Sequence, residues 1–250
     1  MSTHRFLLVL PLLLIPAAAA PSPIVTDRPG FLFSSLNVGR GVFQIELGLP
    51  AVTLDGARST SLFALVRYGV TDRFELRIDS PVYNQRTGAR STERGFGDLE
   101  VGAKWHLLDN AGARPSLALI PSVTVPVGET GFSAGKPVYQ LNAMAEWTLQ
   151  DGWGIGALAG YLNGPSGGGR YGQETLGVAL GRSLPSPKWS AYGEAVQVIT
   201  SLSGANDSSF LGGGVKYLIS DDSQLDLSFD RGLTSGSPDW LLGLGFSARF

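Results

Sequence analysis

The sequence predicts an all-β protein, a single transmembrane antiparallel β-barrel of about twelve strands that follows an irregular N-terminal segment. Apolar and polar residues alternate with period two in segments of about 9–11 residues. Long and short connections alternate between these segments, and aromatic residues gather at two levels of the apolar faces. Tilted strands of this length are long enough to span a bilayer.

Composition excludes several other classes of protein. The 250 residues contain no cysteine, which excludes disulfide scaffolds, cysteine-based zinc sites and thiol catalysis. The 34 glycines show no G-X-Y period, so the chain is not collagen, and 43% hydrophobic residues are too many for a disordered chain. A net charge of −2 leaves no basic footprint, so no nucleic-acid partner is expected.

The first twenty residues predict a secretory signal peptide (1–20). Arg5 supplies a positive start, residues 6–15 form a short apolar run, and the alanines at 17–20 offer a cleavage site. The alternative is an N-terminal membrane anchor, which two prolines and a length below about 20 residues disfavour. The mature chain is therefore expected in the bacterial outer membrane.

Residues 21–41 are irregular, with Pro, Gly and Ser punctuation, and the barrel is predicted over residues 42–250. An even number of strands is typical of bacterial outer-membrane barrels. The predicted strands are 42–50, 61–69, 73–82, 97–107, 115–125, 139–149, 153–163, 173–183, 188–198, 209–219, 223–232 and 239–250.

The connections support this topology. The long ones include VYNQRTGARSTERGFG, PVGETGFSAGKPV, NGPSGGGRYGQ and SLSGANDSS, and the short ones include VTDR, QDG and SDD. Long outer loops and short periplasmic turns are the rule for such barrels. With twelve strands, both chain termini fall on the periplasmic side.

Alternation alone also fits a soluble sandwich, but the positions of the aromatic residues favour a membrane. A sandwich core would hold its aromatics in mid-strand, whereas here they gather at the strand ends, as in interfacial girdles. The predicted periplasmic girdle consists of Trp105, Trp147, Trp153, Trp189, Tyr217 and Phe250. Outer-membrane lipid is therefore an expected partner. The terminal Phe250 resembles the recognition signal of outer-membrane barrels, which predicts the barrel-assembly machinery as a second partner.

The opposite faces of the strands carry polar residues that are expected to line the lumen. Either they form a polar passage or they pair with one another and fill a narrow barrel. The charged members are Glu46, Arg67, Glu75, Arg77, Asp79, Glu100, Lys104, Glu146, Glu194, Lys216, Asp226, Asp230 and Arg249.

Twelve strands leave some internal space, which the segment 21–41 could occupy as a partial plug. Asp27, Arg28 and Arg40 would then pair with charges of the wall. The alternative is a disordered periplasmic tail.

No catalytic residue, metal site or cofactor is predicted. The mature chain has one histidine, His106, near the periplasmic end of its strand, and no G-x-S-x-G, H-E-x-x-H or P-loop motif. Asp226 and Asp230 could form a metal site or a glycosidase-like pair, but ordinary polar lumen groups explain them as well.

Three stretches, TDRPGFLFSSLNVGRGVFQIELGLP, LVRYGVTDRFELRI and GFGDLEVGAKWHLL, resemble the outer-membrane family of meta-pathway phenol-degradation proteins. The resemblance covers roughly Thr26 to Phe250. It implies uptake of small hydrophobic or aromatic compounds and supplies no catalytic residues.

The sequence thus favours a channel for passive uptake of small apolar or aromatic solutes, with Phe63 among the residues that contact them. The alternatives are a sealed barrel with a structural or adhesive role and, third, a barrel hydrolase that uses His106.

Overall fold

The computed structural model describes residues 23–54 and 56–250, so the predicted signal peptide, residues 1–20, lies outside the described residues. The strands are β1 (Phe43–Leu54), β2 (Ala57–Thr71), β3 (Phe74–Thr87), β4 (Thr92–Gly95), β5 (Leu99–Leu108), β6 (Ser116–Val125), β7 (Val138–Thr148), β8 (Trp153–Ser166), β9 (Gly169–Ser183), β10 (Trp189–Thr200), β11 (Ser208–Ser220), β12 (Ser223–Gly232) and β13 (Trp240–Arg249). One short 3₁₀ helix, η1 (Gln150–Gly152), joins β7 to β8. No helix in this part of the chain is long and apolar enough to cross a membrane.

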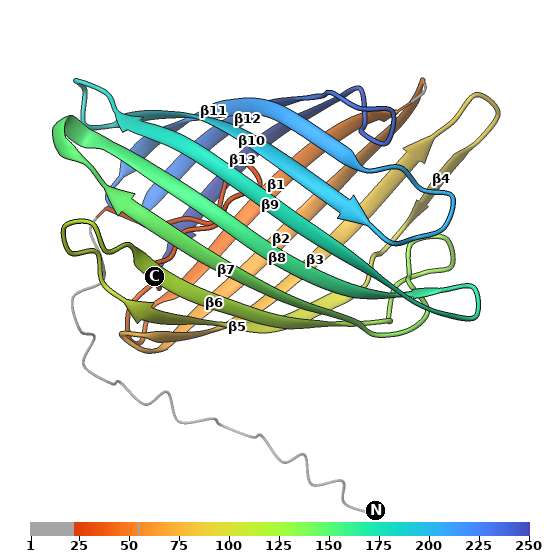
Figure 1. Cartoon of the computed structure of the whole chain (residues 1–250), viewed down its shortest axis with the longest axis horizontal. Helices are drawn as coiled ribbons and strands as arrows, with labels where there is room; N and C mark the ends of the chain where they lie inside the picture. The colour runs from red at the N-terminus through yellow and green to blue at the C-terminus, as the bar shows by residue number, and fades with distance from the viewer. Residues whose placement is uncertain (1–22, 55) are drawn as a thin grey trace, which may run out of the picture.

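Twelve strands close into an antiparallel barrel (Figure 1). Around the ring each strand pairs with the next one along the chain, except that β3 pairs with β5, and β1 pairs with β13 to complete the ring. The short strand β4 pairs only with the outer part of β3 and lies outside the ring. Closure pairs both edges of each of the twelve ring strands, which a sheet surrounded by lipid requires.

The seam of the barrel joins the two ends of the strand sequence. Gln44 pairs with Arg249 and Thr53 with Trp240 along an unbroken register. The last residue takes part, since Phe43 and Phe250 exchange two backbone hydrogen bonds of 3.1 and 2.8 Å.

The two ends of the barrel differ in their connections. At one end, here called the turn end, the strands are joined by residues 72–73, 109–115, 149–152, 184–188 and 221–222. The C-terminus lies at this end, on the left of Figure 1. The other, the loop end, carries the hairpin of β3 and β4, the twelve-residue connection 126–137, the connections 201–207 and 233–239, and the short connection 167–168.

Two of the predicted long loops are mostly strand. β3 continues to Thr87 and returns as β4, and β8 and β9 continue until only Gly167 and Gly168 separate them. The prediction was wrong here because Gly, Ser and Arg in these stretches look like loop residues. Once β-pairing is under way, the ladder extends past the membrane without any apolar face to support it.

Alternation places apolar residues outside and polar residues inside. In β12, Asp226 is 2% exposed while its neighbour Leu227 is 46% exposed. The exposed apolar side chains form the surface that would face lipid, where their exposure to water is not a cost.

The irregular segment 23–41, called the N-terminal segment below, runs inside the turn half of the barrel (Figure 1). It contacts inward-facing residues of β3, β5, β7, β10 and β12. These strands lie all around the ring, so the barrel wall encloses the segment.

Candidate functional site in the barrel interior

A charge cluster joins the N-terminal segment to the wall of β1, β2, β3 and β5. At its centre, the Arg67 guanidinium donates to Glu46 and Glu75, each at 2.8 Å, and all three side chains are fully buried. The Lys104 ammonium lies 2.6 Å from Asp27, and Arg77 contacts both Asp27 and Glu75. Its members are Asp27, Glu46, Arg67, Glu75, Arg77 and Lys104. Three cations thus meet three carboxylates, and the desolvation of each is offset by charged partners.

Asp27 is the one member of the charge cluster that the N-terminal segment contributes. Its backbone N–H donates to Glu46 at 3.0 Å, and its carboxylate accepts from the Ser34 N–H at 2.9 Å. Burial alone would raise the pKa of the Asp27 carboxyl, but Arg67, Lys104 and Arg77 hold that pKa well below its usual range. Asp27 is therefore an anion at any ordinary pH.

Wall carboxylates also satisfy the free backbone N–H groups of the N-terminal segment. Glu75 accepts from Val38 at 2.9 Å, Glu146 from Ser35 at 2.6 Å and Glu194 from Phe31 at 3.0 Å. An irregular segment has no ladder of its own, so buried N–H groups need such acceptors. These acids hold the segment in place.

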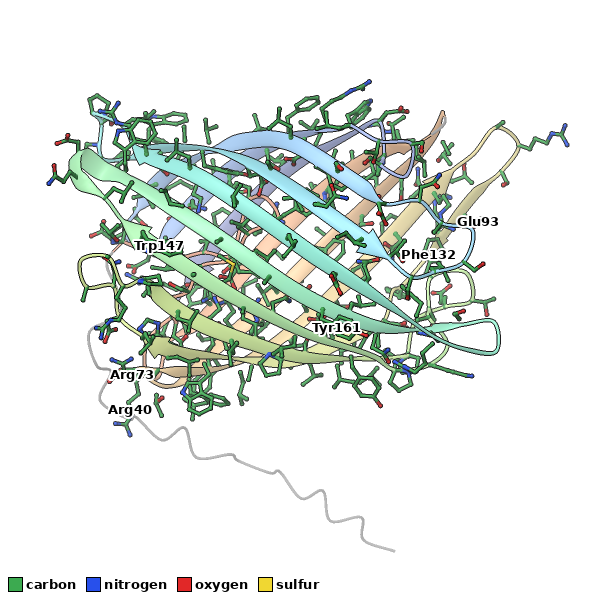
Figure 2. All side chains as sticks on the ribbon, viewed as in Figure 1. Arg40, Arg73, Glu93, Phe132, Trp147 and Tyr161 are labelled. Atoms are coloured by element: carbon green, nitrogen blue, oxygen red, sulfur yellow. The ribbon has the colours of Figure 1, made fainter. Side chains whose placement is uncertain are left out.

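The remaining residues predicted for the segment and the wall have different positions. Arg28 reaches Asp226 at 3.4 Å. Arg40 is exposed at the turn end (Figure 2) and forms no ion pair with any described residue of the wall. Arg249 contacts Asp222 of the last turn at 2.7 Å. Asp230 of β12 is buried beside Gly212, its pairing partner on β11.

The inner wall of β6 to β11 carries an apolar strip: Ala118, Ile120, Met144, Leu158, Val196 and Phe210. Leu32 and Phe33 of the N-terminal segment pack on it, and the Phe31 ring lies 5.0 Å from the Phe210 ring. The approach is close at Gly177, where a Cβ would lie 2.9 Å from Leu32. Glycine there makes room for the segment.

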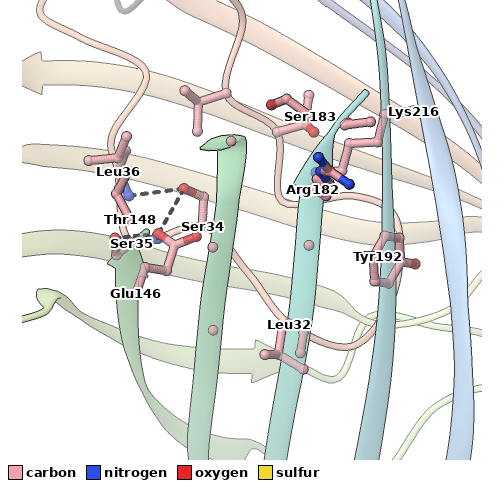
Figure 3. A pocket seen from close by; sticks show the side chains of 18 of the residues that line it. Leu32, Ser34, Ser35, Leu36, Glu146, Thr148, Arg182, Ser183, Tyr192 and Lys216 are labelled. Carbon is pink, nitrogen blue, oxygen red and sulfur yellow. Dashed lines mark hydrogen bonds between the residues drawn. The ribbon is translucent and has the colours of Figure 1, made fainter. Parts of the chain in front are cut away.

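A cavity of about 720 Å³ opens at the turn end, between the N-terminal segment and the wall (Figure 3). Leu32 and Met144 contribute apolar surface to it. Glu146 lies on one side, hydrogen-bonded to Ser34 and Ser35, and Lys216 lies on the other.

A second cavity, of about 300 Å³, lies toward the loop end. Phe63, Asp79, Glu100 and Phe132 line it. Asp79 and Glu100 were predicted to line the lumen and Phe63 to contact the solute, whereas Phe132 belongs to the connection 126–137.

Asp98 holds the connection 126–137 in place at this loop-end cavity through hydrogen bonds. The Asp98 carboxylate accepts from the Gly128 N–H at 2.9 Å and the Ala134 N–H at 2.8 Å. Burial acts to raise the pKa of Asp98, but these hydrogen bonds outweigh it and lower the pKa.

The residues predicted as a girdle lie on the outer surface at the turn end. Trp105, Trp153 and Trp189 are exposed, and the Trp189 ring packs on Tyr217 with 4.8 Å between centroids. Figure 2 labels Trp147 at this end, where its indole N–H donates to the Ala113 carbonyl at 3.0 Å. Phe250 is 78% exposed.

His106 is held by two contacts. One ring nitrogen lies 2.9 Å from the Ser35 carbonyl and the other 2.7 Å from the Asp109 carboxylate. Among the described residues, no hydroxyl group bonds to either nitrogen. Nucleophilic hydrolysis needs a hydroxyl within reach of the base.

Sequence reasoning missed the apolar strip because it assigned inward faces to polar residues alone. Both faces of β6 are apolar, with Leu117 and Leu119 outside and Ala118 and Ile120 inside. A strand with two apolar faces in an otherwise alternating chain was the available signal.

The sequence profile of the family described as "Putative MetA-pathway of phenol degradation" matches residues 26–250. No curated protein matches the sequence.

Solved structures share the fold. An outer membrane channel from Pseudomonas putida F1 aligns with a TM-score of 0.68 at 15% identity, over 89% of this chain and 99% of that one. The NanC porin aligns with a TM-score of 0.57 at 11% identity, over 82% and 98%. The KdgM porin, in complex with disordered oligogalacturonate, aligns with a TM-score of 0.54 at 10% identity, over 84% and 99%. Closed twelve-strand architecture and these neighbours locate the chain in the bacterial outer membrane.

Proposed function

This chain belongs to the family described as "Putative MetA-pathway of phenol degradation", and on that premise we propose that it is a passive channel for small apolar or aromatic molecules. No cofactor, metal or energy source enters the proposal. The solute moves down its own gradient through the barrel interior.

The observation that carries the proposal is the apolar strip on the inner wall. Ile120, Met144 and Leu158 give part of the inner wall an apolar surface, which the passage of sugars or ions does not require. Met144 also lines the turn-end cavity, and Thr124, on the same face of β6 as Ile120, lines the loop-end cavity. The strip therefore runs from the turn-end cavity toward the loop-end cavity, and Ser122 and Thr124 continue the same face of β6 to that second cavity.

The charge cluster and the N-terminal segment set the width of this route. The cluster ties the segment to the wall of β1 to β5, so the route lies on the other side, where Leu32 and Phe33 cover the apolar strip. In this proposal the segment is a partial plug, and side-chain movement of Leu32 and Phe33 admits the solute.

The test compares uptake of labelled phenol with uptake of the polar sugar arabinose. Cells that lack the chromosomal copy express the wild-type protein, Leu158→Asp, or the control Ser203→Asp, which puts the same charge in the exposed connection 201–207. We expect Leu158→Asp to lower phenol uptake several-fold. A carboxylate within the strip holds water there, and an apolar solute would have to displace that water at a cost in free energy. The Ser203→Asp control should match the wild type.

The anomalous gel migration of the unboiled protein checks that each variant is folded, and Leu158→Ser gives a milder second variant. Phenol uptake that is the same for wild type and both Leu158 variants would contradict the proposal. Under the alternative hypothesis of a sealed barrel, phenol uptake would not depend on the protein at all.

A further inference from the structure

Four inward-facing residues form a row across neighbouring strands at the turn end. Ser183 of β9 pairs with Ser190 of β10, Ser190 pairs with Lys216 of β11, and Lys216 pairs with Asp226 of β12. Directly opposed residues in an antiparallel sheet have Cβ atoms about 5 Å apart. The first three, called the donor row below, line the turn-end cavity.

The donor row has unused hydrogen-bonding capacity. The hydroxyls of Ser183 and Ser190 and the Lys216 ammonium form no hydrogen bond or ion pair with any residue that the structure describes. Lys216 forms no ion pair with the neighbouring Asp226, which Arg28 contacts instead at 3.4 Å. Carboxylates such as Glu46, Asp226 and Glu146 attract the Lys216 ammonium, but it donates to none of them, so its N–H groups remain available to water or a ligand.

The acids that line the same cavity are already engaged. Glu146 accepts from the Ser35 N–H at 2.6 Å, and Glu194 accepts from the Phe31 N–H at 3.0 Å. Lys216 and Ser183 therefore lie across the cavity from Glu146, whose carboxylate is already hydrogen-bonded (Figure 3). The group that completes the cavity is an anion, and a planar carboxylate can accept from an ammonium and a hydroxyl together.

The rest of the cavity suits an apolar body. Leu32 and Met144 supply aliphatic and thioether surface, and the Tyr192 ring of β10 is next to Ser190 on the inner face. A volume of about 720 Å³ lies within the usual range for small-molecule sites.

We propose that the donor row binds the carboxylate of a small apolar acid, such as an aromatic carboxylate, among the solutes that the barrel admits. This inference rests on the proposed uptake function and names a solute class for it. The ammonium of Lys216 and the hydroxyls of Ser183 and Ser190 hold the carboxylate, while Leu32, Met144 and Tyr192 contact the apolar part.

The test is equilibrium dialysis of labelled benzoate against the purified full-length protein in detergent. Lys216→Met removes the charge and keeps the length of the side chain, and we expect it to weaken benzoate binding about tenfold, the typical worth of one charged hydrogen bond. Ser190→Ala should weaken binding by a smaller factor, and Lys216→Arg should retain most of it. The control is Lys136→Met in the exposed connection 126–137, which should bind as the wild type does.

Two competitors define the ligand class. Benzamide has the same ring without the charge and should compete poorly, and inorganic phosphate has charge without an apolar body and should also compete poorly. Benzoate binding that is equal in wild type and Lys216→Met, or phosphate that competes as well as benzoate, would overturn the inference. Phenol uptake in cells is a separate readout: its failure would remove the proposed function, whereas unchanged benzoate binding in Lys216→Met would remove only the carboxylate site.

Discussion

The inner wall of this barrel has two unlike halves. From β1 to β5 it is built on the charge cluster, in which Arg67 and Lys104 are fully buried among carboxylates. From β6 to β11 it presents the apolar strip, with Ile120 and Met144 almost fully buried. The N-terminal segment touches both, through Asp27 on the polar half and through Leu32 on the apolar half.

The difference teaches what each half contributes. Ion pairs are directional, so the polar half sets one position for the segment. Apolar contacts are not directional, so the other half tolerates small movements without losing all of its stabilisation. A partial plug that must stay in place and still admit solute needs both kinds of contact.

The largest expected effect comes from breaking the polar half with Arg67→Met. Glu46 and Glu75 would lose their main partner while remaining buried, which costs about 3–5 kcal/mol in the free energy of unfolding. Urea unfolding, followed by the gel shift of the unboiled protein, measures it. The control, Arg73→Met, breaks an exposed pair with Asp109 and should leave the unfolding curve nearly unchanged. Equal losses in the two variants would show that the buried cluster has no special role.

A substitution in the apolar half should lower the free energy of unfolding by less than Arg67→Met does. Met144→Ala removes a buried side chain from the strip, at a cost of about 2 kcal/mol in the same unfolding measurement, because Leu32 and Phe33 can move into the space. A loss of stability as large as that of Arg67→Met would mean that the two halves are equally rigid.

A smaller, local effect on the mobility of the N-terminal segment distinguishes its two contacts with the wall, Asp27 in the charge cluster and Leu32 on the apolar strip. A spin label on Leu36→Cys, a side chain that is 40% exposed, reports the mobility of the segment without disturbing its contacts. Asp27→Asn should make the label more mobile, because Lys104 and Arg77 lose their charged partner. Leu32→Ala should leave the label nearly as ordered as in the wild type. The reverse result would make the apolar strip the principal anchor.

Mild acid should have the smallest effect of all on the position of the N-terminal segment. The pKa of Asp27 is lowered in the folded protein, so its contribution is fully present above its unfolded pKa of about 3.9 and is lost only as the pH falls toward the folded pKa. The spin label at position 36 should therefore give the same spectrum at pH 8 and pH 5. Release of the segment within that range would show that a different group controls its docking.

Alternation predicted the strands and their faces well because lipid allows only an apolar outer face, which leaves a strong period of two in strands such as β12. It could not predict which charges meet. The contacts of Arg67 with Glu46 and Glu75 depend on the register between strands, and a periodic pattern does not contain the register.

The interior of the barrel was harder to predict than its wall. The N-terminal segment has no periodicity, so its charges suggested a plug but not the position of each contact: Asp27 lies in the centre of the cluster, whereas Arg40 is exposed. The donor row was missed because Ser183 and Ser190 are ordinary residues in sequence. Only the pairing of β9, β10 and β11 brings them beside Lys216.

The seam between β1 and β13 has a consequence for how the chain is made. The first strand finds its second partner only when the last one has been synthesised and delivered, since Phe43 exchanges hydrogen bonds with Phe250, the final residue. Loss of the last strand through a premature stop codon would leave two open edges in the sheet and no local substitute for the missing partner. An intermediate in which β1 and β13 are not yet paired has such edges, so pairing at this seam is the step that protects the backbone of the sheet.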